Sequence, residues 1–225
     1  MRNRALIAGF VLLAAAFLGA GEVLDRLVAT VNGHALLASD WEEELRYECF
    51  MAKRPLAALT SDERNRALDR LIDQELVGEQ MHSAEFKAAS PDEIDRQMEA
   101  LRSGYGDGRG EESWSGALRS YGISEATIRR HVELELNQSR LIEARLRPAV
   151  EVDSAAVESY YREQLVPKIA PAEAPALAAA EPAIRELLIE KKVNDSLSSW
   201  LQTLRSQAQI RVLTRESSSP PAEAQ

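Results

Sequence analysis

Residues 24–45, LDRLVATVNGHALLASDWEEEL, carry the local signals around which the chain is organised. Residues 27–31 are apolar and include two valines and a threonine, a composition typical of a β-strand. Asn32-Gly33 is the dipeptide that best tolerates the positive φ angles of a two-residue type I′ turn. Residues 34–38 would then run back as a second strand. The sequence therefore predicts a β-hairpin.

A helix is predicted directly after the hairpin. Ser39 and Glu42 have the spacing of a capping box, so we expect the helix to start near Asp40. It would run to about Arg54 and carry apolar residues on two sides. Such a helix is either sandwiched inside a core or offers one side to a partner. One side holds Trp41, Leu45, Cys49 and Ala52, and the other holds Tyr47, Phe50 and Met51.

The predicted hairpin has an edge that needs a further strand. Two strands alone are marginally stable in water, and an unpaired edge is prone to aggregation. Gln209 to Leu213, QIRVL, is the best remote candidate for the missing strand. We therefore expect the segment near the start of the mature chain to pair with the segment near its end.

Residues 1–21 are typical of a secretory signal peptide. Arg2 and Arg4 precede an apolar run over residues 5–20, and small residues follow for cleavage after Ala20 or Gly21. The alternative is an uncleaved anchor, although the run is shorter than the roughly 20 residues of a spanning helix. Cleavage removes two arginines and no acidic residue, so the net charge changes from −9 to −11. We expect a periplasmic protein.

Composition limits the class of protein. So acidic a chain is a poor partner for nucleic acid. The single Cys49 leaves no internal disulfide, so an ordinary apolar core must hold the fold. Ala, Leu, Glu and Arg dominate, which favours a mainly helical protein. We expect a multi-helix, mainly α module with a small β-hairpin near the N-terminus, joined by a C-terminal strand.

The chain divides into five predicted segments. The helical region after the signal peptide contains further capped helix starts at Thr60, Ser90 and Ser124 and a helix stop at Pro148. A Pro/Ala-rich stretch reads as a semi-rigid connector, and the Ser/Pro-rich end lacks the apolar residues needed to order itself. The segments are a signal peptide (1–21), a helical region with the hairpin (22–166), the connector (167–180), a long helix and strand packing back on the first region (181–213) and a disordered tail (214–225).

No catalytic or metal-binding pattern appears in the sequence. The three histidines, His34, His82 and His131, form no metal-ligand spacing with one another or with Cys49. We expect no enzyme activity, no cofactor, no metal and no small-molecule substrate.

Apolar and aromatic residues outside the regular core stripes are the remaining candidates for a site. Flexible apolar side chains can adapt to many unfolded or extended chains. The alternative for each of these residues is an ordinary place in the core. The candidates for binding a polypeptide client are Tyr47, Phe50, Met51, Trp114, Tyr160 and Tyr161.

Four blocks of the sequence resemble the non-catalytic chaperone module of exported folding factors of the SurA and PpiC type. They are LDRLVATVNGHALLASD at 24–40, ALDRLIDQELVGEQM at 67–81, SPDEID at 90–95 and IRELLIEKKVNDSLSSWLQTLRSQAQIRVL at 184–213. The resemblance implies a helical cradle, closed by the C-terminal helix and strand, that holds unfolded outer-membrane or secreted proteins without ATP. It supplies no residue-level sites.

The chain departs from that family in one respect. Members usually carry parvulin-type prolyl isomerase domains before the final helix, and such a domain needs roughly 100 residues. Only 29 residues separate Val152 from Pro182. We therefore expect a holdase without isomerase activity. The alternatives are an isomerase-related folding factor and a structural adaptor with one dedicated partner. A homodimer remains open under each of these readings, the holdase included.

Overall fold

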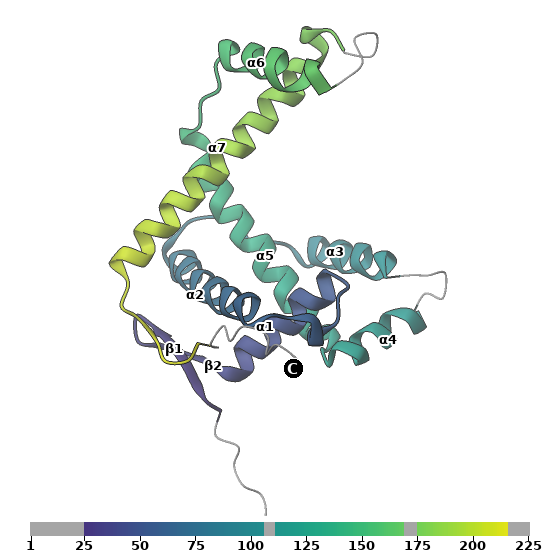
Figure 1. Cartoon of the computed structure of the whole chain (residues 1–225), viewed down its shortest axis with the longest axis vertical. Helices are drawn as coiled ribbons and strands as arrows, with labels where there is room; N and C mark the ends of the chain where they lie inside the picture. Colours follow the sequence, from purple (N-terminus) through teal and green to yellow (C-terminus); the bar gives the residue numbers. More distant parts are fainter. Residues whose placement is uncertain (1–24, 106–110, 169–174, 216–225) are drawn as a thin grey trace, which may run out of the picture.

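The fold is taken from a computed structural model that describes residues 25–105, 111–168 and 175–215. Within these residues the protein is mainly α, with seven α-helices and one small sheet (Figure 1). The predicted signal peptide and the predicted tail beyond residue 215 lie outside them. The helices are α1 (Ala38–Met51), α2 (Ser61–Ser83), α3 (Pro91–Gly104), α4 (Glu111–Tyr121), α5 (Glu125–Leu146), α6 (Ser154–Tyr160) and α7 (Leu177–Gln207).

The sheet confirms the predicted hairpin and the predicted pairing of remote segments. β1 (Leu27–Val31) pairs antiparallel with β2 (His34–Leu37) on one side and with β3 (Ile210–Val212) on the other. Asn32 and Gly33 have φ angles of 50° and 91°, as a type I′ turn requires. Asn32 also closes the new edge, because its side-chain oxygen accepts from the backbone N–H of Gln209 at 2.8 Å.

The cap of α1 differs from the prediction. Ser39 is already inside the helix, and both its backbone N–H and its hydroxyl donate to the carboxylate of Asp25. Asp40 takes over the capping role, since its side chain accepts from the backbone N–H of Leu37 at 2.9 Å. A long-range carboxylate has therefore displaced the local capping box that the spacing of Ser39 and Glu42 suggested.

The predicted capped helix starts at Thr60, Ser90 and Ser124 are confirmed. At α2, Thr60 accepts from the backbone N–H of Glu63, and the Glu63 carboxylate accepts in return from the backbone N–H of Thr60 at 2.8 Å. A capping box also begins α3, where the Glu93 carboxylate accepts from the backbone N–H of Ser90, and a single cap begins α5, where the Ser124 hydroxyl accepts from the backbone N–H of Thr127. Each such cap contributes about 1 kcal/mol to helix stability.

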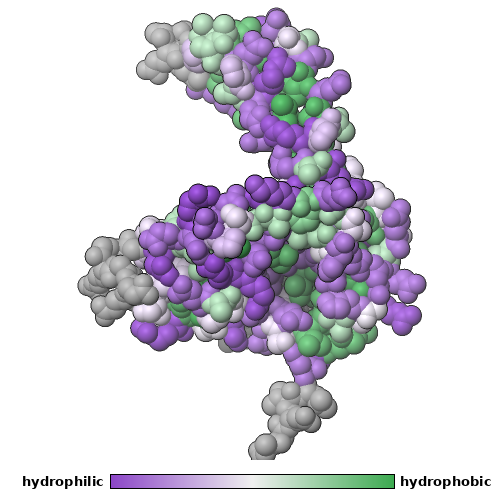
Figure 2. All heavy atoms as spheres, turned by 180° about the vertical axis from the view of Figure 1, so that it is seen from behind, coloured by the Kyte–Doolittle hydropathy of each residue, from purple (hydrophilic) through white to green (hydrophobic). Residues whose placement is uncertain are grey.

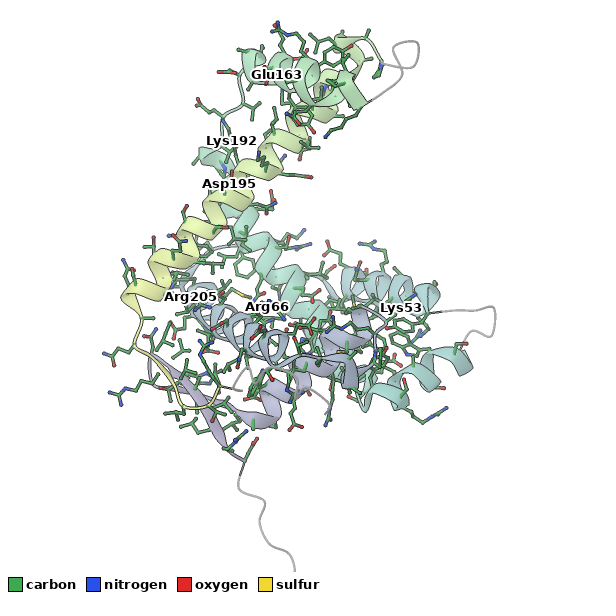
Figure 3. All side chains as sticks on the ribbon, viewed as in Figure 1. Lys53, Arg66, Glu163, Lys192, Asp195 and Arg205 are labelled. Carbon is green, nitrogen blue, oxygen red and sulfur yellow. The ribbon has the colours of Figure 1, made fainter. Side chains whose placement is uncertain are left out.

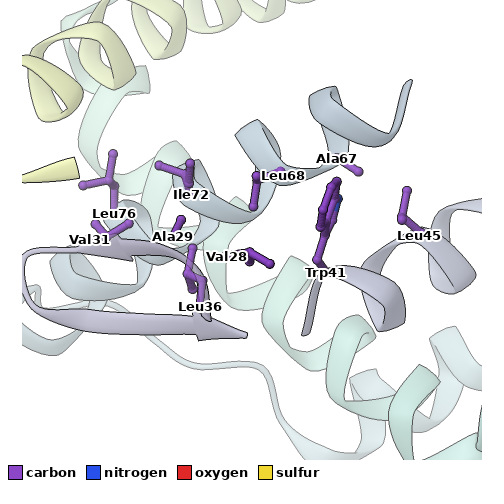
Figure 4. Close-up of a cluster of buried hydrophobic side chains, with 10 residues drawn as sticks. All are labelled: Val28, Ala29, Val31, Leu36, Trp41, Leu45, Ala67, Leu68, Ile72 and Leu76. Carbon is purple, nitrogen blue, oxygen red and sulfur yellow. The ribbon is translucent and has the colours of Figure 1, made fainter. Parts of the chain in front are cut away.

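Two apolar cores lie on opposite sides of α1. The sheet core, drawn in Figure 4, joins β1 and β2 to α1 and α2, and the aromatic core joins α1 to α3, α4 and α5. α1 is therefore sandwiched, the first of the two arrangements expected from its two apolar sides. The sheet core is Val28, Ala29, Val31, Leu36, Trp41, Leu45, Ala67, Leu68, Ile72 and Leu76, and the aromatic core is Tyr47, Phe50, Ile94, Met98, Trp114, Leu118, Ile123, Ile128 and Val132.

α7 begins earlier than predicted. The expected start was near Pro182, after a connector over residues 167–180, but the helix already begins at Leu177 and Pro182 lies inside it. Alanine has the highest helix propensity, and residues 178–180 are three alanines. Leu177 and Ala180 also pack against α6, so apolar burial extends the helix over the end of the predicted connector. Residues 169–174 lie outside the described residues.

The start of the predicted disordered tail is attached to the fold. The backbone N–H of Thr214 donates to the carbonyl of Val28 at 3.3 Å, and Arg215 pairs with Asp69 at 2.9 Å. The prediction is therefore wrong for these two residues.

The molecule has two parts (Figure 1). We call the sheet with α1–α5 the body. The arm consists of α6, the helical turns that follow it over 161–168, and the N-terminal half of α7. α7 has 31 residues, about 46 Å of helix, and its C-terminal half returns across α2 to the sheet. The arm has its own apolar cluster, in which Val157, Ala180 and Ile184 are buried.

Candidate client-binding surface

Three of the six predicted client-binding residues are buried in the body. Tyr47, Phe50 and Trp114 all belong to the aromatic core and expose at most 4% of their surface. The prediction of a surface role is wrong for them, because α3, α4 and α5 cover the second apolar side of α1. An extended chain cannot reach these side chains while the body is folded.

The geometry of these aromatic residues accounts for their burial. The ring of Phe50 stacks on Tyr105 with centroids 4.3 Å apart and meets Trp114 edge-on at 5.5 Å. The indole N–H of Trp114 donates to Glu125 at 3.1 Å. Stacked and edge-to-face pairs contribute about 0.5–1.5 kcal/mol each beyond area burial. These residues stabilise the body.

The other three predicted residues are accessible but lie apart. Met51, at the end of α1 in the body, is 40% exposed. Tyr160 and Tyr161 are half-buried in the arm, where the hydroxyl of Tyr161 donates to the carbonyl of Pro175 at 2.7 Å. The structure therefore does not bring the six residues together into one site.

An exposed leucine on α7 was not among the predicted residues. Leu187 lies on the arm and is 43% exposed. A signal for it exists in the sequence, because α7 carries a second apolar side that includes Leu187, and a side without a covering helix stays at the surface. Trp200, further along α7, is half-buried under the guanidinium of Arg145, whose carbon is 5.0 Å from the ring centroid.

The arm overhangs the body and leaves an open hollow between the two (Figure 2). The surface around the hollow mixes hydrophilic and hydrophobic residues. A concave surface of this kind can lie along an extended chain without closing over it. Three accessible apolar or aromatic residues, Leu187, Tyr160 and Tyr161, lie on the arm. Of the six predicted residues, Met51 is the accessible one on the body.

Polar contacts hold the elbow, where the arm leaves the body. Arg147 donates to both carboxylate oxygens of Glu186 on α7, at 2.5 and 2.6 Å. Arg185 and Lys192 of α7 donate to the backbone carbonyls of Val152 and Glu151, at 2.5 and 2.6 Å. Half-exposed ion pairs contribute only about 0–1 kcal/mol each. These polar contacts add to the continuous helix α7, which itself joins the arm to the body.

A buried acid and a buried histidine face each other inside the body. Glu44 is only 4% exposed; one of its oxygens accepts from Gln74 at 3.2 Å, and the other has no hydrogen-bond partner. That second oxygen of Glu44 lies 3.8 Å from Nδ1 of His131. The other ring nitrogen of His131, Nε2, has no hydrogen-bond partner and lies 3.7 Å from a carboxylate oxygen of Glu43. The imidazole stacks on Tyr47 with centroids 4.0 Å apart.

Burial shifts the protonation of this pair. Desolvation, reinforced by the charge of Glu48, raises the pKa of Glu44 to about 7. Desolvation also lowers the pKa of His131, against the attraction of Glu43. Both shifts favour the neutral forms. Since the body encloses both groups, the pair acts on the stability of the fold.

The remaining residues singled out in the sequence have structural surroundings. Cys49 is buried, and burial raises the pKa of its thiol. His34 pairs with Glu75 at 2.9 Å, and Nδ1 of His82 lies 2.8 Å from the carbonyl of Gly78. Within the described residues, no three His, Cys, Asp or Glu side chains gather closely enough to hold a metal ion.

Over the described parts of the chain, no helix has both the length and the apolarity that a membrane crossing requires. No protein-family model matches the chain, and no curated protein sequence matches it either.

Proposed function

We propose that the protein is an ATP-independent chaperone of the periplasm that holds unfolded or extended outer-membrane or secreted proteins and has no isomerase activity. The observation that carries the proposal is the overhang of the arm above the body, which leaves a hollow open to an extended chain (Figure 2). The resemblance of the first and last sequence blocks to exported folding factors, and the signal-like N-terminus, support the cellular setting.

The few exposed apolar residues are compatible with weak holding. Among the described residues, the large apolar side chains that are exposed are Leu27, Met51, Leu187 and Leu213. Each can contribute only part of the 1.5–3 kcal/mol or so that full burial of such a side chain provides. A client held by partial burial can leave as it folds, and the negative net charge, −9 for the full sequence, favours solubility of the complex.

Light scattering from an aggregating outer-membrane protein tests the proposal. We expect suppression of aggregation at a several-fold molar excess of the protein. Leu187→Ser should weaken client binding by about fivefold, because roughly 1 kcal/mol of apolar burial is lost. Leu213→Ser changes a leucine that is 57% exposed beside the sheet and not on the arm, so it is the control and should weaken client binding less than Leu187→Ser does. Absence of any suppression by the wild-type protein would refute the holdase proposal.

A structural adaptor with one dedicated partner is the second candidate. The observation in its favour is the closure of the sheet core and the aromatic core, which leaves scattered exposed leucines and one exposed methionine among the described residues. Affinity purification from periplasm distinguishes the two candidates. One stoichiometric partner supports the adaptor, whereas many substoichiometric unfolded proteins support the chaperone.

A further inference from the structure

An open pocket lies where the end of α1 meets the start of α2. Its volume is about 240 Å³. Glu48, Cys49 and Ala52 come from α1 and its last turn, and the link to α2 and α2 itself provide the other walls. The volume is below the roughly 300–1,000 Å³ of pockets that hold drug-sized ligands. The pocket therefore suits a ligand no larger than a single amino-acid residue.

The walls carry an excess of positive charge. Arg54, Arg66 and Arg70 line the pocket together with the carboxylates of Glu48 and Glu63, so one net positive charge remains. This is the opposite sign to the whole chain, whose net charge is −9. The local field of the pocket therefore favours an anion.

Two of the three arginines are already paired. Arg54 donates to Glu63 at 2.7 Å, and Arg70 contacts both oxygens of Glu48, at 2.6 and 2.5 Å. Arg66, on α2 (Figure 3), has no hydrogen bond or ion pair with any residue that the structure describes. Its guanidinium is exposed and keeps all its N–H donors for a ligand. A planar guanidinium binds a carboxylate through two parallel hydrogen bonds.

The pocket is built before a ligand arrives. The Glu63 carboxylate is fixed by the Thr60 cap and by Arg54, and the Arg54 side chain lowers the pKa of Glu63 to about 2. The backbone N–H of Arg54 donates to the carbonyl of Cys49 at 3.0 Å. A preformed site loses less conformational entropy when it binds.

The charges and the apolar residues that line the pocket narrow the class of ligand. The two carboxylates repel a second negative charge, so a monoanion fits better than a phosphate group that carries two charges. Cys49, Ala52 and Leu59 form an apolar wall beside the guanidinium. The best ligand therefore has one carboxylate next to one apolar side chain.

We propose that this pocket binds the C-terminal residue of an unfolded polypeptide, with the free carboxylate on Arg66 and an apolar side chain against Cys49, Ala52 and Leu59. The inference rests on the proposed function, because it takes the ligand to be a polypeptide chain. It gives the body a role of its own in recognition: the pocket fixes one end of a client while the arm contacts the chain further along.

Fluorescence anisotropy with a labelled, unstructured peptide that ends in leucine tests the inference. One peptide carries a free C-terminal carboxylate and the other a C-terminal amide. We expect the free acid to bind the wild-type protein about tenfold more tightly, the typical effect of a hydrogen-bonded charge. Arg66→Gln should abolish this difference. Since Arg66 has no partner among the described residues, the variant should fold as wild type does.

Arg96→Gln is the matched control, because Arg96 is an exposed arginine on α3 that does not line the pocket. It should keep the full preference for the free acid. Equal binding of the two peptides, or a preference that survives in Arg66→Gln, would overturn the pocket inference. Light scattering on whole clients, measured separately, would then still decide the holdase proposal. Failure of both peptides to bind would overturn the inference as well.

Discussion

The body and the arm are stabilised in different ways. The body has two apolar cores with ten and nine buried residues, and α1 is shared between them. The arm has one cluster with three buried residues, packed between α6 and a single side of α7. Local stability follows the number of buried apolar contacts, so the arm should open at a lower free energy than the body. A rigid part and an adjustable part are thus joined by one helix.

The largest expected effect is the loss of an aromatic side chain from the body. Phe50→Ala removes a fully buried ring and should lower the free energy of unfolding by about 3–5 kcal/mol. Met51→Ala changes the next residue along α1, which is 40% exposed, and should cost less than about 1 kcal/mol. Urea denaturation followed by tryptophan fluorescence measures both. Similar losses for the two variants would contradict the two-core description of the body.

The buried carboxyl group of Glu44 should make the stability of the body depend on pH. The pKa of Glu44 is raised from its ordinary 4.5 to about 7 in the folded state, so its contribution to stability is complete below pH 4.5 and is lost as the pH rises through 7. Linkage makes the loss up to about 3 kcal/mol. The lowered pKa of His131 acts in the other direction, since its contribution is present above its ordinary 6.5 and is lost on acidification.

The variant Glu44→Gln separates the effect of Glu44 on stability from that of His131. The amide keeps the shape of the side chain but cannot ionise, so the variant should gain stability over wild type as the pH increases from 5 to 8. Glu42→Gln is the control, because Glu42 is an exposed residue of the same helix. Thermal denaturation at several pH values measures the difference. A constant difference across this range would mean that Glu44 ionises normally in the folded protein.

The smallest expected effect lies in the arm. Ile184→Ala should destabilise the arm by about 2 kcal/mol, the low end for a buried isoleucine, because its cluster has few members. Hydrogen exchange should accelerate over residues 154–165 and 177–190 while the body keeps its protection. Leu187→Ala, at an exposed position nearby, should leave exchange unchanged. Faster exchange in the body as well would show that arm and body unfold as one unit.

The parts of the fold that depend on local chemistry could be predicted from the sequence. Asn32-Gly33 sets its turn by backbone conformation alone, and the capping boxes at Thr60 and Ser90 need only residues within one helical turn. The pairing of β1 with β3 was also predictable, because an unpaired edge requires a partner. The prediction of the α1 cap was wrong, because Ser39 bonds to Asp25, which lies too far away in the chain for a local spacing rule to reveal the contact.

The candidate site was less predictable than the fold. Periodicity reveals that α1 has two apolar sides but not which of them other helices cover, and three covering helices buried Tyr47, Phe50 and Trp114. The arginine pocket was missed because Arg54, Arg66 and Arg70 follow no motif. Their grouping depends on the turn between α1 and α2. That Arg66 has no partner among the described residues is recognisable only once the partners of the other two arginines are known.

The closure of the sheet depends on a strand that becomes available late. Asn32 and Gln209, which meet at the edge of β1, are 177 positions apart in the chain. At roughly 5–20 residues per second, β3 is made on the order of ten seconds or more after the hairpin. For that interval one side of β1 has no strand to pair with, and the nascent protein is itself an unfinished chain with an open edge.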